Sequence, residues 1–566
     1  MTAEKKEKHV STVQSNRMTI LSQMYFWGLV LMVISLPFSK FMMSVAHFTL
    51  AGILILGFMK LDSYINLKKR YPGFRLYFVI IPAGLQWIFK SFIDIFRRFF
   101  RRENMPAIVF FSLYILHLLG LLLTVDFDYA LKDLRIKLPI LALPVILSVS
   151  RPIEWKAFRA IMMFFIGAVI TGTFISTYIL ISREIDNIRD ISVYISHIRF
   201  SLLISIAIFA LGYFSIRETT LPRWMKGMMF LAILWLLFYL VISASMTGFV
   251  VLSLAVFVLA LYYSRKKKNI YSRKATVALL LAPVILVLYL LGIVSDVYKV
   301  HRVDFSSLDP RTEKGTLYWH DTTNLQTENG YYVWLYIATD ELREAWNQRS
   351  TLDFDGKDNK GQMLKFTLIR YLTSKGLRKD ASGVEKLSKE DIAHIEDGEA
   401  SVHYHERSDF YIRLYKIIWE TQQYFRTGDP SGHSAMQRIE FWKTSILIIR
   451  DHPWLGVGTG DMNIAFQRQY EIMDSPLKPE FRWRSHNQFL SIAVGFGVLG
   501  LIWFLFGLIY PPIKLGRLSD YFYLTFFVIM IVSMLSEDTI ETQAGATIFA
   551  FFTSLFLFGK KDKTLI

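Results

Sequence analysis

Windows of about twenty consecutive apolar residues recur along most of the chain and constrain its fold more than any other feature. Such a window is long enough to cross the hydrocarbon core of a bilayer as a helix. Hydrophobic residues make up 53% of the chain, as is typical of proteins that cross a membrane many times. We therefore predict an all-α polytopic membrane protein with about twelve transmembrane helices. The predicted spans lie near 18–38, 41–59, 106–125, 137–150, 157–182, 200–216, 227–243, 246–264, 275–295, 487–510, 519–536 and 542–558.

The formal net charge of +17 is unevenly distributed between the two sides of these spans. The segment 297–485 holds 26 Lys and Arg against 28 Asp and Glu, so it is nearly neutral. Basic residues cluster instead at 5–8, 68–70, 97–102, 265–268 and 560–563. Because basic loops stay in the cytoplasm, we expect both termini there and the segment 297–485 outside. The charge then reflects membrane topology, and we expect membrane lipids and no nucleic acid as partners.

Five parts follow from this topology. We predict a cytoplasmic tail (1–17), a membrane domain of about nine helices (18–296), a large and mainly helical periplasmic loop (297–485), a second membrane domain of three helices (486–558) and a cytoplasmic tail (559–566). The polar first 17 residues and the lack of a small-residue cleavage site indicate a retained first span. The chain has no cysteines, so the loop is expected to fold without disulfides.

Two shorter regions also have a recognisable pattern. The cytoplasmic segment 60–105 carries apolar residues at helical spacing with basic residues between them, which predicts an amphipathic helix on the inner leaflet. In the large loop, helices are expected at 362–378, 388–397 and 407–426. The predicted span 137–150 is short and contains two prolines, so we expect it to be broken or tilted.

His486 is the strongest candidate for chemistry, because it stands where the large loop re-enters the membrane. The positive end of a helix dipole disfavours imidazolium, so a neutral imidazole should be available there as a base. Arg438 precedes it in the same loop, on a helix that we expect Pro453 to end. One loop thus brings a candidate base and a candidate anion-binding residue to the same face of the membrane.

Other polar residues are candidates for the same site, although each could instead have a purely structural role. Arg199 lies where the chain enters the sixth predicted span, and it is either an anchor or a site residue. Arg484, Asn487, Gly458 and Gly460 are possible neighbours of the site. Glu537, Asp538 and Glu541 lie at the outer ends of the last two spans. They could line the same site.

Two patterns suggest metal binding only weakly. The run His403-Tyr404-His405-Glu406 has a spacing that suits a strand better than a helix, and no further ligand is near in sequence. Asp126 and Asp128 form an Asp-x-Asp pair that is better explained by helix capping and solvation. We therefore expect no metal and no other cofactor.

The motifs over roughly residues 430–505 resemble those of the O-antigen ligase and polymerase-like family of bacterial membrane glycosyltransferases, proteins of GT-C-like architecture. The loop ends in an Arg-(x)3-Trp helix that leads into Pro-x-x-Gly-x-Gly-x-Gly. His-Asn-x-x-Leu then opens a span that contains Gly-x-x-Gly-Leu. The large loop late in a chain of about twelve spans also matches, whereas residues 301–430 show no resemblance.

The resemblance implies transfer of a glycan from an undecaprenyl-diphosphate carrier to an acceptor hydroxyl at the periplasmic face of the bacterial inner membrane. It implies that His486 is the general base, that Arg438 holds the diphosphate, and that the reaction is inverting and metal-independent. One departure from the family pattern is Met246, at the place of a second diphosphate-binding arginine. Either Arg199 supplies that charge from the end of a neighbouring helix, which we favour, or the site works with one arginine fewer, or activity is lost.

Several functions agree with these residues. Ligation of O-antigen to lipid A-core ranks first, because a single large late loop suits a bulky acceptor. Glycan polymerisation and transfer to protein hydroxyls are alternatives within the same class. A lipid-linked glycan transporter is the main alternative from another class, although it predicts broken or charged helices at the bilayer midplane. A third hypothesis is a non-catalytic membrane scaffold or receptor that acts through residues 301–430.

Overall fold

The computed structural model describes residues 3–59, 75–183, 188–243, 245–266, 288–407 and 409–561. Contacts divide the chain into two units, and each is described by itself: unit 1 comprises Met1–Arg273 with Arg438–Ile566, and unit 2 comprises Lys274–Gln437. The described residues are predominantly helical, as predicted, and the only sheet found among them is a two-stranded one. Residues 438–485, which belong to the predicted loop, contact the helices of unit 1.

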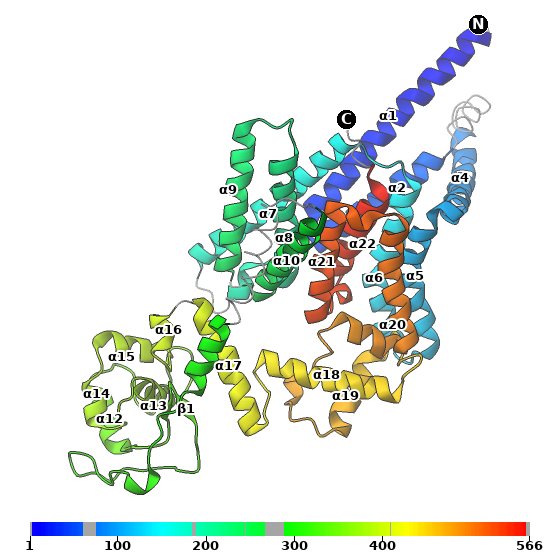
Figure 1. The fold of residues 1–566 in the computed structure, drawn as a ribbon. Coiled ribbons are helices and arrows are strands. Elements are labelled where there is room, and N and C mark those ends of the chain that lie inside the picture. The colour runs from blue at the N-terminus through cyan, green and yellow to red at the C-terminus, as the bar shows by residue number, and fades with distance from the viewer. Residues whose placement is uncertain are drawn as a thin grey trace. The chain divides into compact units, whose positions relative to one another are not determined.

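Unit 1 is a bundle of helices (Figure 1). Its α-helices are α1 Ala3–Ser35, α2 Lys40–Phe58, α4 Arg75–Phe99, α5 Met105–Leu119, α6 Phe127–Val149, α7 Trp155–Ser182, α8 His197–Arg217, α9 Arg223–Ile242, α10 Met246–Lys266, α18 Ser434–Asp451, α19 Met462–Ile472, α20 Gln488–Lys514, α21 Tyr521–Ser536 and α22 Gln543–Ser554. The shorter turns are η1 Arg102–Asn104, η2 Gly120–Leu123, η3 Ile188–Ile191, η5 Pro479–Phe481, η6 Arg517–Ser519, η7 Thr539–Glu541 and η8 Leu555–Gly559.

Seven helices in the described parts of the chain are long and apolar enough to cross a membrane. They cover Met18–Ser35, Lys40–Phe58, Arg102–Leu123, Trp155–Ser182, His197–Arg217, Arg223–Ile242 and Gln488–Lys514. Shorter apolar helices cover Thr247–Tyr262, Leu288–Tyr298, Tyr521–Ser536 and Gln543–Gly559. The chain is therefore a multi-pass membrane protein by composition, and the predicted number of twelve spans is not confirmed. Much of the predicted span 275–295 lies outside the described residues.

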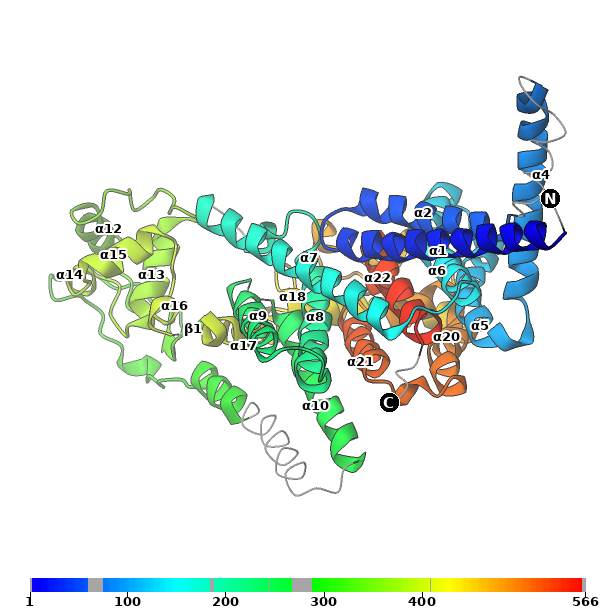
Figure 2. The ribbon, with the colours of Figure 1, turned by 90° about the horizontal axis from the view of Figure 1, so that it is seen from above.

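The centre of unit 1 is α22, whose residues from Ala544 to Ser554 are all buried. A helix that is apolar on all sides needs neighbours on all sides. It packs against α6 and α21, and its phenylalanines contact rings from α7 and α21: Phe552 meets Phe165 edge to face and Phe526 at a tilt. Figure 2 shows α22 surrounded by α1, α6, α7 and α21. The link between α21 and α22 is thereby held within the bundle.

The helix α6 differs from the predicted span 137–150. It begins at Phe127 and is continuous through Pro139 and Pro144, so the helix is not broken at the prolines, and a tilt stays a prediction. Asp126 caps it by accepting a hydrogen bond from the backbone N–H of Tyr129 at 2.9 Å. Its first half carries charged residues, which is why a search for apolar windows detects only its second half.

The segment between the second and third predicted spans forms one helix, α4, which extends from Arg75 to Phe99. Ile95 and Phe99 are buried, and α4 packs against α2 and α6. Phe89, Phe92 and Phe96 are exposed, so the helix has the two faces that the spacing predicts. Its position on the inner leaflet stays a prediction.

Unit 2 has a small core of its own. Its elements are η4 Phe305–Ser307, β1 Thr327–Glu328, β2 Tyr331–Tyr332, α12 Thr339–Asn347, α13 Leu364–Ser374, α14 Ala381–Glu385, α15 Lys389–Glu396, α16 His403–Glu406 and α17 Asp409–Thr427. Trp346, Leu368 and Tyr371 are fully buried in this core. The predicted helices at 362–378, 388–397 and 407–426 correspond to α13, α15 and α17.

Candidate functional site

The candidate site is built on the start of α20 and the link between α21 and α22. Asn487 is the N-cap of α20, and its Oδ1 accepts from the backbone N–H groups of Phe489 and Leu490 at 3.0 and 3.1 Å. Its Nδ2 donates to the backbone oxygen of Leu535, at the end of α21, at 2.9 Å. The buried Gln488 accepts from the backbone N–H of Ile540 at 2.8 Å. The helix start and the link are therefore held together by directed hydrogen bonds.

His486 precedes this cap in a left-handed backbone conformation, with φ of 45°. A non-glycine residue in that region is uncommon and is held there by its surroundings. The ring stacks on Phe441 of α18 with a centroid distance of 5.6 Å, and Nδ1 lies 3.5 Å from Oε2 of Glu537. The side chain is 38% exposed. With Nδ1 facing the carboxylate, Nε2 is the ring nitrogen left for another partner.

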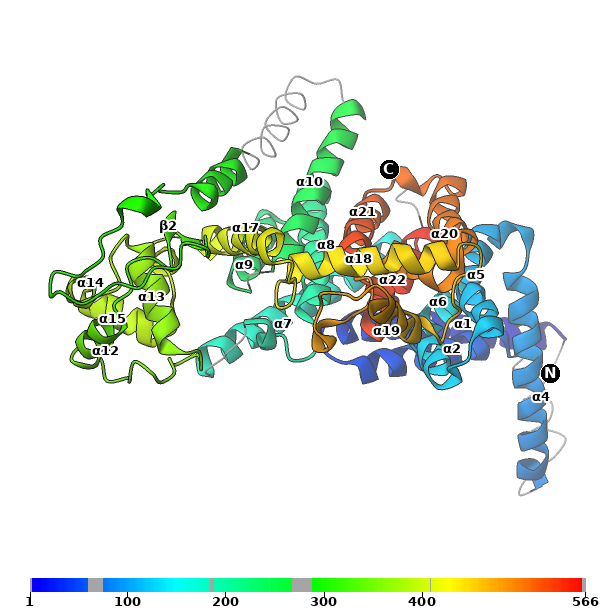
Figure 3. The same ribbon diagram turned by 90° about the horizontal axis from the view of Figure 1, so that it is seen from below.

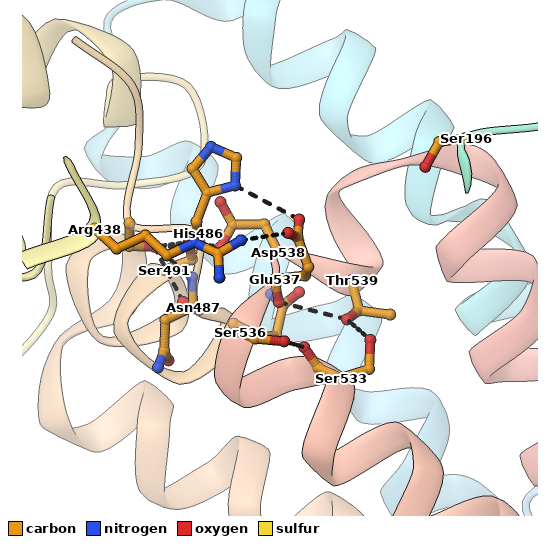
Figure 4. A network of polar contacts seen from close by, with 12 residues as sticks. Ser196, Arg438, His486, Asn487, Ser491, Ser533, Ser536, Glu537, Asp538 and Thr539 are labelled. Carbon is orange, nitrogen blue, oxygen red and sulfur yellow. Dashed lines mark hydrogen bonds and ion pairs between the residues drawn. The ribbon is translucent and has the colours of Figure 1, made fainter. Parts of the chain in front are cut away.

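Two arginines from distant helices meet at the carboxylate of Glu537, and Figure 4 shows Arg438 and His486 beside it. Arg438 on α18 donates from Nη2 to Oε1 of Glu537 at 2.9 Å. Arg199 in the first turn of α8 places Nη1 at 3.9 Å from Oε2 and donates from Nη2 to the backbone oxygen of Asp538 at 3.2 Å. The structure thus brings three predicted site residues, Arg438, Arg199 and His486, around one acidic side chain.

Glu537 carries the only negative charge in direct contact with both guanidinium groups among the described residues. Its side chain is almost fully buried, and burial alone would raise its pKa. The contact with His486 and the charges of Arg199 and Arg438 outweigh this effect and lower the pKa of Glu537 below its ordinary value. Glu537 is therefore ionised at neutral pH, and its single carboxylate is shared between two arginines.

Asp538 fixes the other side of the link. Its Oδ1 accepts from Ser491 at 2.7 Å and from Ser485 at 3.2 Å. Trp442 of α18 donates from Nε1 to the backbone oxygen of Ser485 at 3.1 Å. Residues on both sides of His486 are therefore anchored, which holds its backbone in place. These two serines were not singled out from the sequence, where isolated serines near a helix start carry no distinguishing signal.

A second polar cluster lies next to this link. Arg484 donates from Nη1 to the hydroxyl of Tyr129 at 2.9 Å and lies 3.6 Å from Oε2 of Glu541. Glu541 also accepts from the buried Lys137 of α6 at 2.9 Å, and Lys137 pairs with Asp133. Arg484, a predicted neighbour of the site, is thus engaged with Glu541 and not with Glu537. Lys137 and Asp133 pair within α6 at i, i+4 spacing, and they escaped prediction because their further partners, Glu541 and His117, come from other parts of the chain.

Gly458 and Gly460, also predicted neighbours of the site, have a packing role. The backbone N–H of Gly458 donates to Gly495 O at 2.9 Å, and that of Gly460 donates to Thr124 Oγ1 at 3.1 Å. A Cβ at Gly460 would lie 2.1 Å from the backbone oxygen of Asp126. Glycines allow this close backbone approach, which positions the loop after α18 on the bundle. The backbone of α20 is non-helical at Gly497, where the same loop packs.

The two weak metal patterns have separate outcomes. Asp126 caps α6, and Asp128 belongs to no group of potential metal ligands among the described residues. His403-Tyr404-His405-Glu406 forms the short helix α16, so the preference for a strand is wrong. His403 contacts Oδ1 of Asn329 through Nε2 at 3.0 Å, separately from His405. Met246 is the first residue of α10, and its side chain lies outside what the structure describes.

Fold and site together define a multi-pass helical membrane protein with a polar site, containing two arginines and a histidine, at the start of a late membrane helix. Residues 401–505 match the family model described as O-Antigen ligase. This match includes His486 and Arg438, and it confirms the resemblance to the O-antigen ligase-like family. It supports a glycosyltransferase-like activity of the kind that this family carries. No curated protein matches the chain.

Proposed function

We propose that this protein transfers a glycan from an undecaprenyl-diphosphate carrier to an acceptor hydroxyl at the periplasmic face of the bacterial inner membrane. The observation that carries the proposal is the convergence of Arg438, Arg199 and His486 on Glu537 at the start of α20. Guanidinium groups that can bind an anion, placed beside a histidine, are what a displacement with a diphosphate leaving group requires.

The proposed reaction is a displacement at the anomeric carbon. The acceptor oxygen forms a bond to that carbon while the bond from the carbon to the diphosphate oxygen breaks. The acceptor proton passes to Nε2 of His486, and the electron pair of the broken bond stays on the diphosphate. Attack from the side opposite the leaving group inverts the anomeric centre. Guanidinium groups suit the departing diphosphate because they bind it through two parallel hydrogen bonds.

Glu537 has two tasks in this proposal. Its Oε2 lies 3.5 Å from Nδ1 of His486, and a carboxylate in that place orients the imidazole and stabilises it once the proton has arrived. Its contacts with both arginines also hold their side chains in the site before the carrier binds. Glu537 is thus a positioning residue, whereas His486 acts on the acceptor.

The surroundings of α18 support a site at the membrane surface. Figure 3 shows α18 lying across the ends of α20 and α21, with α19 beside it. Phe441 and Ile448 of α18 are buried, whereas Ile446 and the following Trp454 are exposed by 59% and 66%. Exposed tryptophans are typical of the boundary between lipid and water. An acceptor from the aqueous side and a carrier from the lipid side could both reach such a site.

The direct test is glycan transfer by the purified full chain in proteoliposomes. A lipid-linked glycan donor is supplied with lipid A-core, with a growing glycan or with a protein acceptor, and products are separated by gel electrophoresis and mass spectrometry. We expect a product with lipid A-core first, while a product with one of the other acceptors would make this protein a polymerase or a protein glycosyltransferase. Movement of the intact donor across the bilayer without any product would favour the transporter and contradict our proposal.

A further inference from the structure

Unit 2 contains a group of three side chains that could share a metal ion, and it is independent of the proposed transferase site. Nδ1 of His394 lies 3.0 Å from Oε2 of Glu399, and Nδ1 of His405 lies 3.4 Å from the same oxygen. All three ligand atoms lie within 4.8 Å of one another. Among the described residues this is the only group of three or more histidine, aspartate or glutamate side chains so arranged.

The local fold explains how the three residues meet. Ser388 and Asp391 form a capping box that starts α15, and His394 lies in the last turn of that helix. Gly398, with φ of 74°, then reverses the chain so that the backbone N–H of Glu399 donates to the backbone oxygen of His394 at 2.9 Å. The short helix α16 brings the ring of His405 parallel to that of His394, with a centroid distance of 4.0 Å.

The distances fit the coordination sphere of zinc. Zinc binds histidine nitrogen and carboxylate oxygen at about 2.0–2.2 Å in a tetrahedron, so two of its ligand atoms lie about 3.3 Å apart. The two measured distances to Oε2 of Glu399 are close to that edge. Because the two rings are parallel, one ring must tilt for both nitrogen lone pairs to point at one ion. Either ring has room to do so, since the side chains of His394 and His405 are 33% and 25% exposed.

Oε2 of Glu399 supplies a second observation. This oxygen is buried and makes no hydrogen bond with any group in the described residues, although two ring nitrogens lie near it. A buried carboxylate oxygen normally has a partner, because leaving it without one is costly. A cation between the oxygen and the two nitrogens satisfies all three atoms at once.

We propose that His394, Glu399 and His405 bind one divalent transition-metal ion, with zinc as the ion that suits two imidazoles and a carboxylate. The two histidine side chains are 33% and 25% exposed, so the remaining coordination position faces solvent and is filled by water. The ion ties the end of α15 to α16 and thereby closes the loop between them. Its role is in unit 2 and does not depend on the proposed transferase activity.

The test measures zinc on the full-length protein, purified in detergent with an affinity tag that contains no histidine. After dialysis against zinc chloride and then against buffer, mass spectrometry should find about one zinc per chain. His394→Ala, His405→Ala and Glu399→Gln should each weaken zinc binding by at least about 100-fold, since losing a group that merely orients a ligand already costs about 10–100-fold. His433→Ala is the matched control, because His433 faces a single carboxylate, that of Glu420, at 3.8 Å.

A second variant gives a spectroscopic signature. The chain has no cysteine, so His405→Cys introduces its only thiol. Addition of cobalt(II) should then produce a thiolate-to-cobalt charge-transfer band that is absent from the unmodified protein and from His433→Cys. Wild-type protein without retained zinc, or ligand variants that bind zinc as tightly as the wild type, would overturn the proposal. A folded His405→Cys variant without the band would do so as well.

Discussion

The variant His486→Gln distinguishes two roles of His486: a general base, and a residue that only positions the acceptor. Glutamine can keep a hydrogen bond to Glu537, but it cannot take up a proton near neutral pH. A positioned base typically contributes about 10²–10⁴ in rate, or about 2.7–5.4 kcal/mol of barrier. The stacking of the ring on Phe441 is worth less, about 0.5–1.5 kcal/mol, which corresponds to roughly 2–12-fold. A loss above about 100-fold therefore requires the loss of proton transfer.

The assay compares initial rates of glycan transfer in proteoliposomes that contain equal amounts of folded protein. His486→Ala and His486→Gln should both lose at least about 100-fold, whereas Phe441→Leu should lose roughly 10-fold or less. His452→Gln is the matched control, since His452 is an exposed histidine just after α18. Both His486 variants should still bind the carrier lipid. Transfer by His486→Gln within about 3-fold of wild type would show that the residue positions the acceptor and is not the base.

Four further predictions address the anion site, the glycine loop, unit 2 and topology. Arg438→Lys and Arg199→Lys should each slow transfer about 10–100-fold, because an ammonium cannot make two parallel hydrogen bonds to the diphosphate. Wild-type rates from both variants would show that the arginines have no part in the mechanism. Gly460→Ala should lower the melting temperature, with a cost of about 1–3 kcal/mol from the backbone clash, and an unchanged melting curve would contradict this packing role. Burial lowers the pKa of Lys379 to about 7, so stability should fall as the pH drops from about 10 to about 7, and Lys379→Met should flatten this dependence in melting curves. Glu385→Cys, at a side chain that is 65% exposed, should react with a membrane-impermeant maleimide in intact cells whose outer membrane has been permeabilised. Labelling only after the cells are lysed would show that the predicted topology is the wrong way round.

The sign of the pH effect follows from which state binds more protons. The unfolded chain holds a proton on this lysine up to its ordinary pKa of 10.5, whereas the folded chain releases it near 7. Between these values the unfolded state binds more protons, and lowering the pH therefore favours unfolding. Below about pH 7 both states are protonated, and the effect levels off. Methionine removes the titrating group but leaves the backbone oxygen of Tyr332, which accepts from Lys379 at 3.1 Å, without this donor.

Local sequence patterns were sufficient to predict that the protein is helical and which face of α18 is buried. Phe441 and Ile448, which lie seven positions apart and so on one face of a helix, are buried, and Pro453 follows soon after the helix ends at Asp451, as expected. Asn487 was a possible neighbour of the site and is the cap of α20. Each of these features depends on residues within a few positions in sequence, where helical periodicity and capping preferences act.

Long-range partners could not be predicted in the same way. Arg438 and Glu537 are far apart in sequence, and their contact requires α18 to lie against the link after α21. The start of α6 was missed because Asp133 and Lys137 interrupt the apolar pattern, although each has a buried partner of opposite charge in the folded chain. Likewise, His405 was considered with its neighbours in sequence, while its partners His394 and Glu399 come from the preceding helix and turn.

Glu537 also bears on how the site would turn over. If the arginines bind the carrier diphosphate as we propose, the product of the reaction carries more free negative charge at the site than the substrate did, and it would be released slowly from two unopposed guanidinium groups. A carboxylate attached to the same bundle is always present and returns to the arginines without having to diffuse to them. It would compete with the departing diphosphate in every cycle. Glu537→Gln would then be expected to retain spent carrier, so that a first round of transfer, slowed by the loss of the carboxylate beside His486, is followed by strong product inhibition.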